Sequence, residues 1–318
     1  MIVIRECRGF EELQACVDLQ VQVWGYSDGD VIPRRVFLVA QKIGGQVIGA
    51  FDVDPGVESD AENGNEGDAS NLIGFAFGLP GAKTGGKSFG GRSTGEKSRI
   101  GKPDSYLHSH MLAVKDGYRN QKIGARLKLA QREDALRRGF RRMEWTFDPV
   151  EIKNSFLNIH KLGAVVRKYE ENFYGVSSSR LQGGLQTDRL VAEWWLDTPR
   201  VDAAIAGLPG WDQPESLEEI RVPAEIYAWK ATDADRHLAV AVQKENRARF
   251  QRAFAAGLAV IGFTRDSRGD GIFHLGRWTE PEETGEGAPP AAIGNRTTDN
   301  QRLESQATVE TAGRVIFS

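Results

Sequence analysis

Two histidines stand two residues apart in the stretch HSHMLAV, at His108 and His110. The apolar residues around them predict a strand over residues 106–114, and alternation along a strand places both imidazoles on one face. Two residues of strand separate such side chains by roughly 6.5–7 Å, which is too far for a direct hydrogen bond but suits a bridging water. Because the ordinary pKa of imidazole lies close to neutral pH, the pair is a candidate for accepting a proton during catalysis.

The histidine pair has two other interpretations. It is also typical of a structural pair on a half-buried strand. An H-x-H pattern on a strand can chelate zinc, but a third ligand is needed, and no adjacent residue supplies one, so we expect no metal. The other histidines, His160, His237 and His274, are scattered along the sequence and are expected to be structural or exposed.

A second group of residues that indicates chemistry is the basic stretch YRNQKIGARL, which begins at Tyr118. It opens a predicted helix over residues 121–138, so successive backbone N–H groups point out of the helix start. Aligned amides and the positive end of a helix dipole bind a pyrophosphate well. Cations oppose the dipole at this end, so a bound anion explains them better than helix stability does. The four cations are Arg119, Lys122, Arg126 and Lys128.

These residues belong to one strand–turn–helix–strand unit. A turn at 115–117 follows the first strand, and the helix is closed by Gly139, with Ala125, Leu129 and Leu136 along its expected apolar stripe. The next strand, over residues 141–147, alternates apolar and polar side chains. Other expected strands cover 2–7, 46–53, 72–78, 165–174, 190–196, 219–226, 258–263 and 271–278, other expected helices cover 11–24, 154–162 and 233–256, and 197–216 is expected to be a linker.

The stretch GAKTGGKS matches the phosphate-binding pattern G-x-x-x-x-G-K-[ST] from Gly81 to Ser88. A predicted strand precedes it, but the segment SFGGRSTGEKSRIGKPDS has no apolar periodicity, so the helix that the motif requires is not expected. The sequence therefore favours a solvated, mobile insertion over 79–105, and a second one over the acidic stretch 54–71. A P-loop NTPase remains the least favoured alternative.

Composition excludes several classes of protein. Among the 318 residues are seven Trp and fifteen Phe, enough to build a core, and the net charge of −3 argues against a nucleic-acid partner. No run of 18 apolar residues predicts a membrane span, and charged residues within 1–10 argue against a signal peptide. Cys7 and Cys16 are expected to be thiols rather than a disulfide, which favours a cytoplasmic protein.

The motif LAVKDGYRNQKIGARL resembles the central motif of the GNAT acyltransferase superfamily. Val114 ends the strand, Arg119 follows five residues later, and Gly124 occupies the last glycine place, whereas Lys122 stands where the first glycine is usual. The turn HKLGA at 160–164 is similar to the end of the second cofactor motif of the family. Ile159 stands where the family often has a tyrosine that serves as general acid. NSFLNIHKLGAVVRKYEENFYG and TDRLVAEWWLD are similar to a bacterial branch of acetyltransferases.

The resemblance, which covers residues 1–198, implies where the cofactor lies. CoA occupies a V between the splayed fourth and fifth strands, its pantetheine amides pair with the fourth strand, and its pyrophosphate lies on the turn that opens the helix. The arylalkylamine acetyltransferases of this superfamily have the same H-x-H, which implies that His108 and His110 remove the amine proton. The implied cofactor residues are Leu112, Ala113, Val114, Arg119, Asn120, Gln121, Lys122, Ile123, Gly124, Ala125 and one or both of Asn154 and Asn158.

The expected architecture is an α+β GNAT fold over 1–198, a small α+β region over 199–278 and a loose polar tail over 279–318. The expected activity is transfer of an acetyl or other short acyl group from acyl-CoA to a small amine or amino acid, by direct attack in a ternary complex. Tyr169 and Tyr174 are candidates for the general acid, and Glu193 and Asp148 for binding the acceptor ammonium. An acyl-CoA sensor without turnover is the main alternative, and the resemblance leaves a homodimer open.

Overall fold

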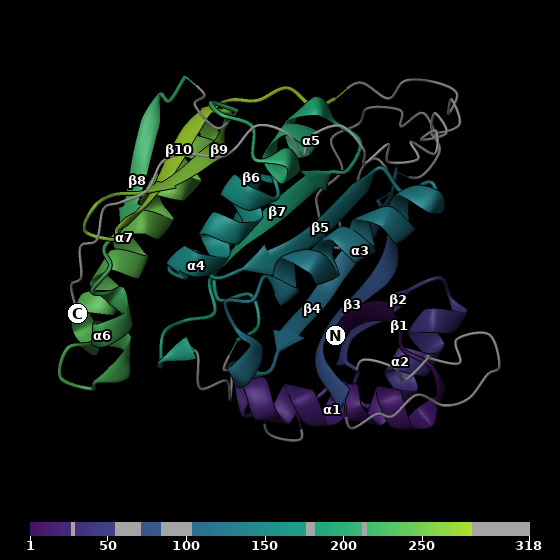
Figure 1. Ribbon diagram of the computed structural model, residues 1–318. Coiled ribbons are helices and arrows are strands. Elements are labelled where there is room, and N and C mark those ends of the chain that lie inside the picture. Colours follow the sequence, from purple (N-terminus) through teal and green to yellow (C-terminus); the bar gives the residue numbers. More distant parts are fainter. Residues whose placement is uncertain (27–28, 55–70, 84–103, 176–181, 212–214, 282–318) are drawn as a thin grey trace, which may run out of the picture. The chain divides into compact units, whose positions relative to one another are not determined.

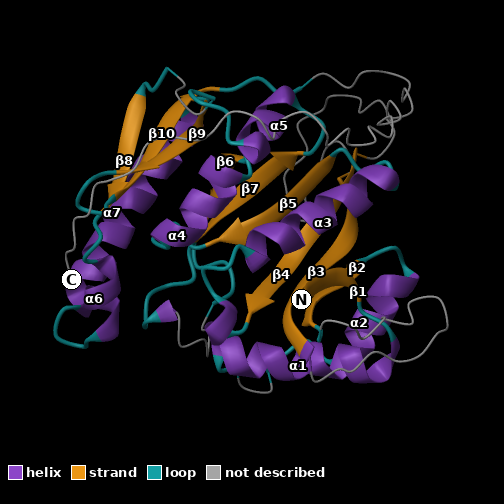
Figure 2. Ribbon diagram, in the orientation of Figure 1, coloured by secondary structure: helices purple, strands orange, loops and turns teal. Residues whose placement is uncertain are grey.

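A mixed sheet of ten strands forms the frame of the protein (Figures 1 and 2). The strand order is β1-β2-β3-β4-β5-β7-β6-β9-β10-β8. Neighbouring strands pair antiparallel, except β4 and β5, which run parallel. The expected fold class, an α+β fold with a mixed, mostly antiparallel sheet that divides between strands four and five, is confirmed.

The computed structural model describes residues 1–26, 29–54, 71–83, 104–175, 182–211 and 215–281. The strands are β1 (Ile2–Glu6), β2 (Gln46–Asp52), β3 (Leu72–Lys83), β4 (Asp104–Val114), β5 (Arg142–Phe147), β6 (Val165–Glu170), β7 (Arg189–Trp195), β8 (Glu218–Val222), β9 (Leu258–Arg265) and β10 (Gly271–Arg277). The helices are α1 (Gly9–Trp24), α2 (Arg34–Lys42), α3 (Ile123–Arg137), α4 (Ile152–Ser155), α5 (Pro199–Ala206), α6 (Ile226–Ala231) and α7 (Arg236–Ala255), with a 3₁₀ turn η2 (Asp116–Tyr118) and a π-helical segment η3 (Phe156–Lys161).

The first half of the sheet is covered on both faces by helices. Alternation along β3 sends Phe75 and Phe77 toward α1 and α2, where Phe37 packs against them. The opposite face, with Ala76 of β3, packs against Leu127 of α3. Buried residues are spread along α3 from Ile123 to Ala135. This packing holds the first turn of α3 close to the end of β4.

The second half of the sheet continues without a break into the C-terminal elements. β6 pairs with β9 at Val166 and Val260, and one hydrophobic cluster includes residues of β5, β7, β9, β10 and α7. Residues Met1–Pro281 accordingly form one compact unit. The second unit, Glu282–Ser318, lies outside the described residues.

Three local expectations need correction. The expected linker over 197–216 contains α5, which begins at Pro199 and is followed by Gly207 in the left-handed conformation (φ 64°). Proline in the first turn and glycine after the last are ordinary helix boundaries. The strand expected over 165–174 ends at Glu170. The buried side of α3 follows Ile123, Leu127 and Ala135, not the expected stripe.

The segment with the phosphate-binding pattern is partly described. Gly81 and Lys83 continue β3 and pair with Tyr106 and Asp104 of β4, so both ends of the expected insertion over 79–105 are strand. Residues 84–103, which include Gly86 to Ser88, lie outside the described residues, as do residues 55–70 of the other expected insertion. Cys7 and Cys16 are buried free thiols with their sulfurs 3.8 Å apart.

Candidate active site

β4 and β5 diverge, and a cavity opens where they do. Only two residue pairs join the strands, Leu107 with Met143 and His108 with Glu144. Beyond His108, every second residue of β4 turns its backbone N–H and C=O away from β3 toward this opening. The cavity has a volume of about 470 Å³, and its walls include Ser109, His110 and Leu112 of β4, Lys128 of α3, and Trp145 and Asp148 at β5. An unpaired strand edge beside a cavity can hydrogen-bond an extended ligand.

The two histidines lie side by side on β4. Phe77 and Gly78 of β3 pair with Met111 and Ser109 of β4, so His110 between them is the extra residue of a β-bulge in β4. The imidazole centroids of His108 and His110 are 5.9 Å apart, and His110 also meets the ring of Phe77 edge-on. The geometry agrees with the expected proximity, and of the two histidines His110 is the one that lines the cavity.

Both imidazoles are neutral at neutral pH. Burial, together with the charges of His110, Lys128 and Lys83, lowers the pKa of His108 to about 4. Burial also lowers the pKa of His110. Each ring therefore has a free nitrogen lone pair that can accept a proton, although His108 is a weaker base than free imidazole.

The turn between β4 and α3 contains two residues in the left-handed backbone conformation. Asn120 (φ 66°) and Lys122 (φ 62°) both adopt the left-handed region, which is costly for residues with a Cβ. The family pattern has glycine at the place of Lys122, and the positive φ gives the physical reason for that preference. The first N–H groups of α3 have no partner inside the helix and point out of its start.

The residues around this turn are only partly arranged as expected. Arg119 is exposed and forms an ion pair with Asp116 at 2.7 Å. Gly124 lies so close to β4 that an added Cβ would be 3.3 Å from a methyl of Leu112. Arg126 donates to the backbone oxygen of Ile2, away from the turn.

Lys128 requires a correction, since the sequence predicted that it surrounds the phosphate turn. Its side chain lies beneath the sheet and lines the cavity. Its Nζ donates to Ser109 Oγ at 2.8 Å and lies 3.7 Å from the ring centroid of Trp145. Only 4% of the residue is exposed, so Lys128 belongs to the cavity between β4 and β5.

The far wall of the cavity is formed by α4 and η3. Asn154 and Asn158 both line it, Asn154 exposed and Asn158 buried. The π-helical turn that carries Asn158 is a rare conformation that is frequent at functional sites. Ile159 is fully buried, so the place of the tyrosine of the family pattern faces the core.

The structure separates the two tyrosine candidates. Tyr174 lines the cavity, and its hydroxyl lies 2.9 Å from Thr146 Oγ1 on β5. Tyr169 instead donates to the buried carboxylate of Asp188 and stacks on Phe250. Tyr169 is therefore part of the contact between β6 and α7.

The two carboxylate candidates also differ. Asp148 follows β5 and lines the cavity, whereas Glu193 forms a salt bridge with Arg167 at 2.7 Å. Sequence reasoning missed Lys230 of α6, which places its ammonium 2.8 Å from Glu151 and 3.7 Å from Asp148. The C-terminal elements thus contact the acidic side of the cavity.

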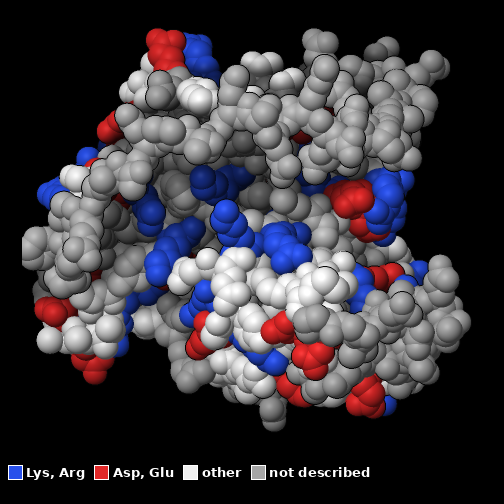
Figure 3. Space-filling view, in the orientation of Figure 1, with Lys and Arg blue, Asp and Glu red and all other residues white. Residues whose placement is uncertain are grey.

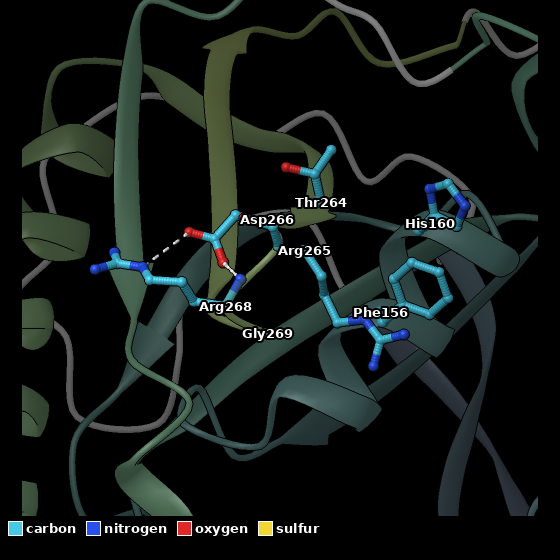
Figure 4. A pocket seen from close by; sticks show the side chains of 8 residues that line it. Phe156, His160, Thr264, Arg265, Asp266, Arg268 and Gly269 are labelled. Carbon is cyan, nitrogen blue, oxygen red and sulfur yellow. Dashed lines mark hydrogen bonds and ion pairs between the residues drawn. The ribbon is translucent and has the colours of Figure 1, made fainter. Parts of the chain in front are cut away.

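A second cavity lies at the turn between β9 and β10 (Figure 4). It is more open, with a volume of about 610 Å³. Phe156 stacks on His160 and lies under the guanidinium of Arg265, while Asp266 is bound by Arg221. Asp266 is already paired with Arg221 there, and the cavity between β4 and β5 has the unpaired strand edge, so the latter is the better candidate.

Charge supports that choice. Figure 3 shows Lys and Arg side chains gathered in the middle of the face over which Figure 1 draws α3, with acidic side chains mostly toward its edges. Among the described residues, no cluster of His, Cys, Asp or Glu is arranged to hold a metal ion. No described helix has the length and apolar character needed to cross a membrane.

Comparisons with known proteins find similarity only at the level of structure. Neither a protein-family model nor a curated protein matches the sequence. Arabidopsis thaliana NAA60 in complex with acetyl-CoA is 14% identical, with a TM-score of 0.44 over 62% of this chain and 100% of that one. The ribosomal-protein-S18-alanine N-acetyltransferase from Escherichia coli is 12% identical, with a TM-score of 0.41 over 62% and 96% of the two chains. The fold class itself rests on the strand order and the divergence of β4 from β5.

Proposed function

We propose that the protein is a GNAT-type N-acyltransferase that moves an acetyl or other short acyl group from acyl-CoA to a small amine or amino acid. The observation that carries the proposal is the parting of β4 from β5 after His108, which leaves the β4 edge free beside a cavity. The histidine pair and the left-handed turn before α3 lie on the same strand and directly after it. One segment of chain thus supplies a place for the cofactor and for a base.

In this proposal the cofactor follows β4. The pyrophosphate lies against the amides from Arg119 to Ala125, where the dipole of α3 favours negative charge. The pantetheine amides pair with the free edge of β4 at Leu112, Ala113 and Val114. Gly124 fits this arrangement, because its close contact with Leu112 holds the start of α3 against the strand. Asn158, and Asn154 nearer solvent, face the cofactor from η3 and α4.

His110 removes a proton from the acceptor. An alkyl ammonium with a pKa near 10.4 is neutral in only about one molecule in a few thousand at pH 7, a handicap of roughly 4–5 kcal/mol. A neutral imidazole at the cavity wall offers a proton acceptor within the site. His108 lies behind His110 and passes the proton on through a bridging water.

The acyl transfer is a direct attack. The amine nitrogen forms a bond to the thioester carbonyl carbon, and the carbon–sulfur bond then breaks. A backbone N–H of β4 between Leu112 and Val114 stabilises the negative oxygen of the intermediate. The attacking nitrogen loses its second proton to water, and Tyr174 supplies a proton to the departing thiolate and takes one back from water. Cys7 and Cys16 are buried in the core between α1 and the sheet, so neither serves as a nucleophile in the cavity.

The acceptor amine enters from the open end of the V. Asp148 and Glu151 lie on this side and are held by Lys230, so a cationic amine finds carboxylates there. The reduced thiols fit a reducing compartment, and a cytoplasmic location belongs to the proposal.

The proposal is tested by calorimetric titration with CoA and with ATP–Mg²⁺, followed by an amine library with acetyl-CoA and detection of free thiol. We expect CoA to bind, ATP–Mg²⁺ not to bind, and at least one amine to release thiol. Absence of CoA binding would overturn the proposal. Binding of CoA esters without transfer to any amine would instead indicate a sensor.

A further inference from the structure

A buried lysine stands at the closed end of the cavity. Lys128 projects from α3 and lies between β4 and β5, where it touches Ser109 and the face of Trp145. Its contact with Trp145 is a cation–π arrangement, and its contact with Ser109 uses one of its three N–H donors. Lys128 also lines the cavity.

Lys128 has no ion-pair partner among the described residues, and burial alone lowers its pKa well below the ordinary value for lysine. A buried ammonium without an anion is costly, whereas methionine of similar shape would not be. The nearest titratable groups on β4 are His108 and His110, which carry no negative charge. Among the described residues Lys128 has no counter-ion, so a bound anion would supply the charge partner that the ammonium lacks and would favour its protonated form.

The place of Lys128 in the V identifies which part of a ligand it meets. Ser109 directly follows the last β4–β5 pair, so Lys128 marks the point where the strands part. Asp148 lies three residues beyond Trp145, about 10 Å along the strand direction at 3.3 Å per residue. The acidic groups, held by Lys230, therefore stand toward the open end, and the unpaired cation stands at the closed end.

We propose that the acyl group of the bound CoA ester ends in a carboxylate, which the Lys128 ammonium holds at the closed end of the V. This inference rests on the proposed function and specifies its donor as a dicarboxylic acyl-CoA, of which malonyl-CoA and succinyl-CoA are the simplest. A thioester placed on the free β4 edge beyond the bulge directs its acyl chain back toward Ser109. The Lys128 ammonium is a hydrogen-bond donor suited to a carboxylate, whereas Ser109 Oγ accepts from Lys128 and donates to Gln131 Oε1 at 2.8 Å, so it positions the lysine.

The test compares CoA esters of equal carbon number without any acceptor present. Affinities of malonyl-CoA against propionyl-CoA, and of succinyl-CoA against butyryl-CoA, are measured by calorimetry for the wild-type protein and for Lys128→Met. We expect the wild type to prefer the charged ester by at least about tenfold in one pair, as is usual for a buried charge pair. Lys128→Met should lose this preference without losing thermal stability.

Lys122→Met is the matched control, because it removes a cation from the phosphate turn instead. It should weaken all four esters by a similar factor and leave the preference unchanged. The inference is overturned when the esters bind without a preference for the charged one, or when Lys128→Met retains that preference. If no CoA ester binds at all, the proposed function itself fails, so the two failures are distinguishable.

Discussion

His108 of β4 lies opposite Glu144 of β5, and theirs is the last residue pair between the two strands. Everything proposed for the site follows from where this pairing stops. Ser109 is the next residue of β4 and contacts Lys128, and His110 follows it at the bulge. A free strand edge, a cation from α3 and a base thus meet at three consecutive residues of β4, His108 to His110.

His110→Gln should lower kcat/KM by about a hundredfold at neutral pH, the lower end of what a positioned base contributes. The loss should shrink as pH rises toward the pKa of the acceptor amine, because a larger fraction of the amine is then neutral without help. Rates with acetyl-CoA between pH 7 and pH 10 measure this. His237→Gln, at an exposed position on α7, is the control and should leave the profile unchanged. A loss that is equal at every pH would contradict the assigned proton transfer.

His108 should make the protein sensitive to mild acid. Its pKa is about 4 in the folded protein, compared with about 6.5 when unfolded. Between these values the unfolded chain binds the proton and the folded chain does not, so stability falls as pH decreases through this range. The difference corresponds to at most about 3 kcal/mol at 1.36 kcal/mol per pKa unit.

Urea unfolding at pH 7 and at pH 4.5 tests this expectation. His108→Gln removes the titrating group and should reduce the difference in unfolding free energy between the two pH values. A variant whose loss of stability at pH 4.5 equals that of the wild type would show that other groups cause the acid sensitivity.

The sequence predicted the elements around the candidate site most successfully where the signal was local. The strand with His108 and His110, the turn after Val114 and the following helix all lie within about 30 residues. Apolar periodicity defines such elements without knowledge of the tertiary structure. Alternation alone brought the two histidines together, and the structure gives 5.9 Å between their centroids.

What the sequence did not predict depends on tertiary packing. Ala125 and Leu129 suggested one buried side for α3, but the buried side is a different one and contains Lys128 and Gln131. The burial of polar residues on a helix can be predicted only when the surface opposite them is known. Here that surface is the opening between β4 and β5. The link from Lys230 to Glu151 joins residues 79 positions apart, so no local pattern could indicate it.

Lys122→Gly should stabilise the protein. Lys122 has a φ of 62°, and the left-handed conformation costs a residue with a Cβ about 1 kcal/mol relative to glycine. The gain is partly offset because glycine has more freedom in the unfolded chain, so we expect an increase in unfolding free energy of about 0.5 kcal/mol. Lys122→Ala keeps the strained backbone while removing the charge, and its stability should not increase. An equal gain in both variants would assign the effect to charge rather than to conformation.

Lys230→Met should uncouple the C-terminal elements from the cavity wall. Lys230 is 8% exposed, and its removal leaves Asp148, whose side chain is 10% exposed, and the more exposed Glu151 without their shared cation. Leaving a largely buried carboxylate unpaired is strongly unfavourable, and because Glu151 is partly solvated we expect a loss of about 2 kcal/mol in unfolding free energy. Lys168→Met is the matched control, since Lys168 pairs with Glu170 at an exposed position and such pairs contribute less than about 1 kcal/mol. Chemical unfolding measures the free energy of unfolding of both variants. If the two variants lose similarly small amounts, α6 does not depend on this ion pair for its contact with the cavity.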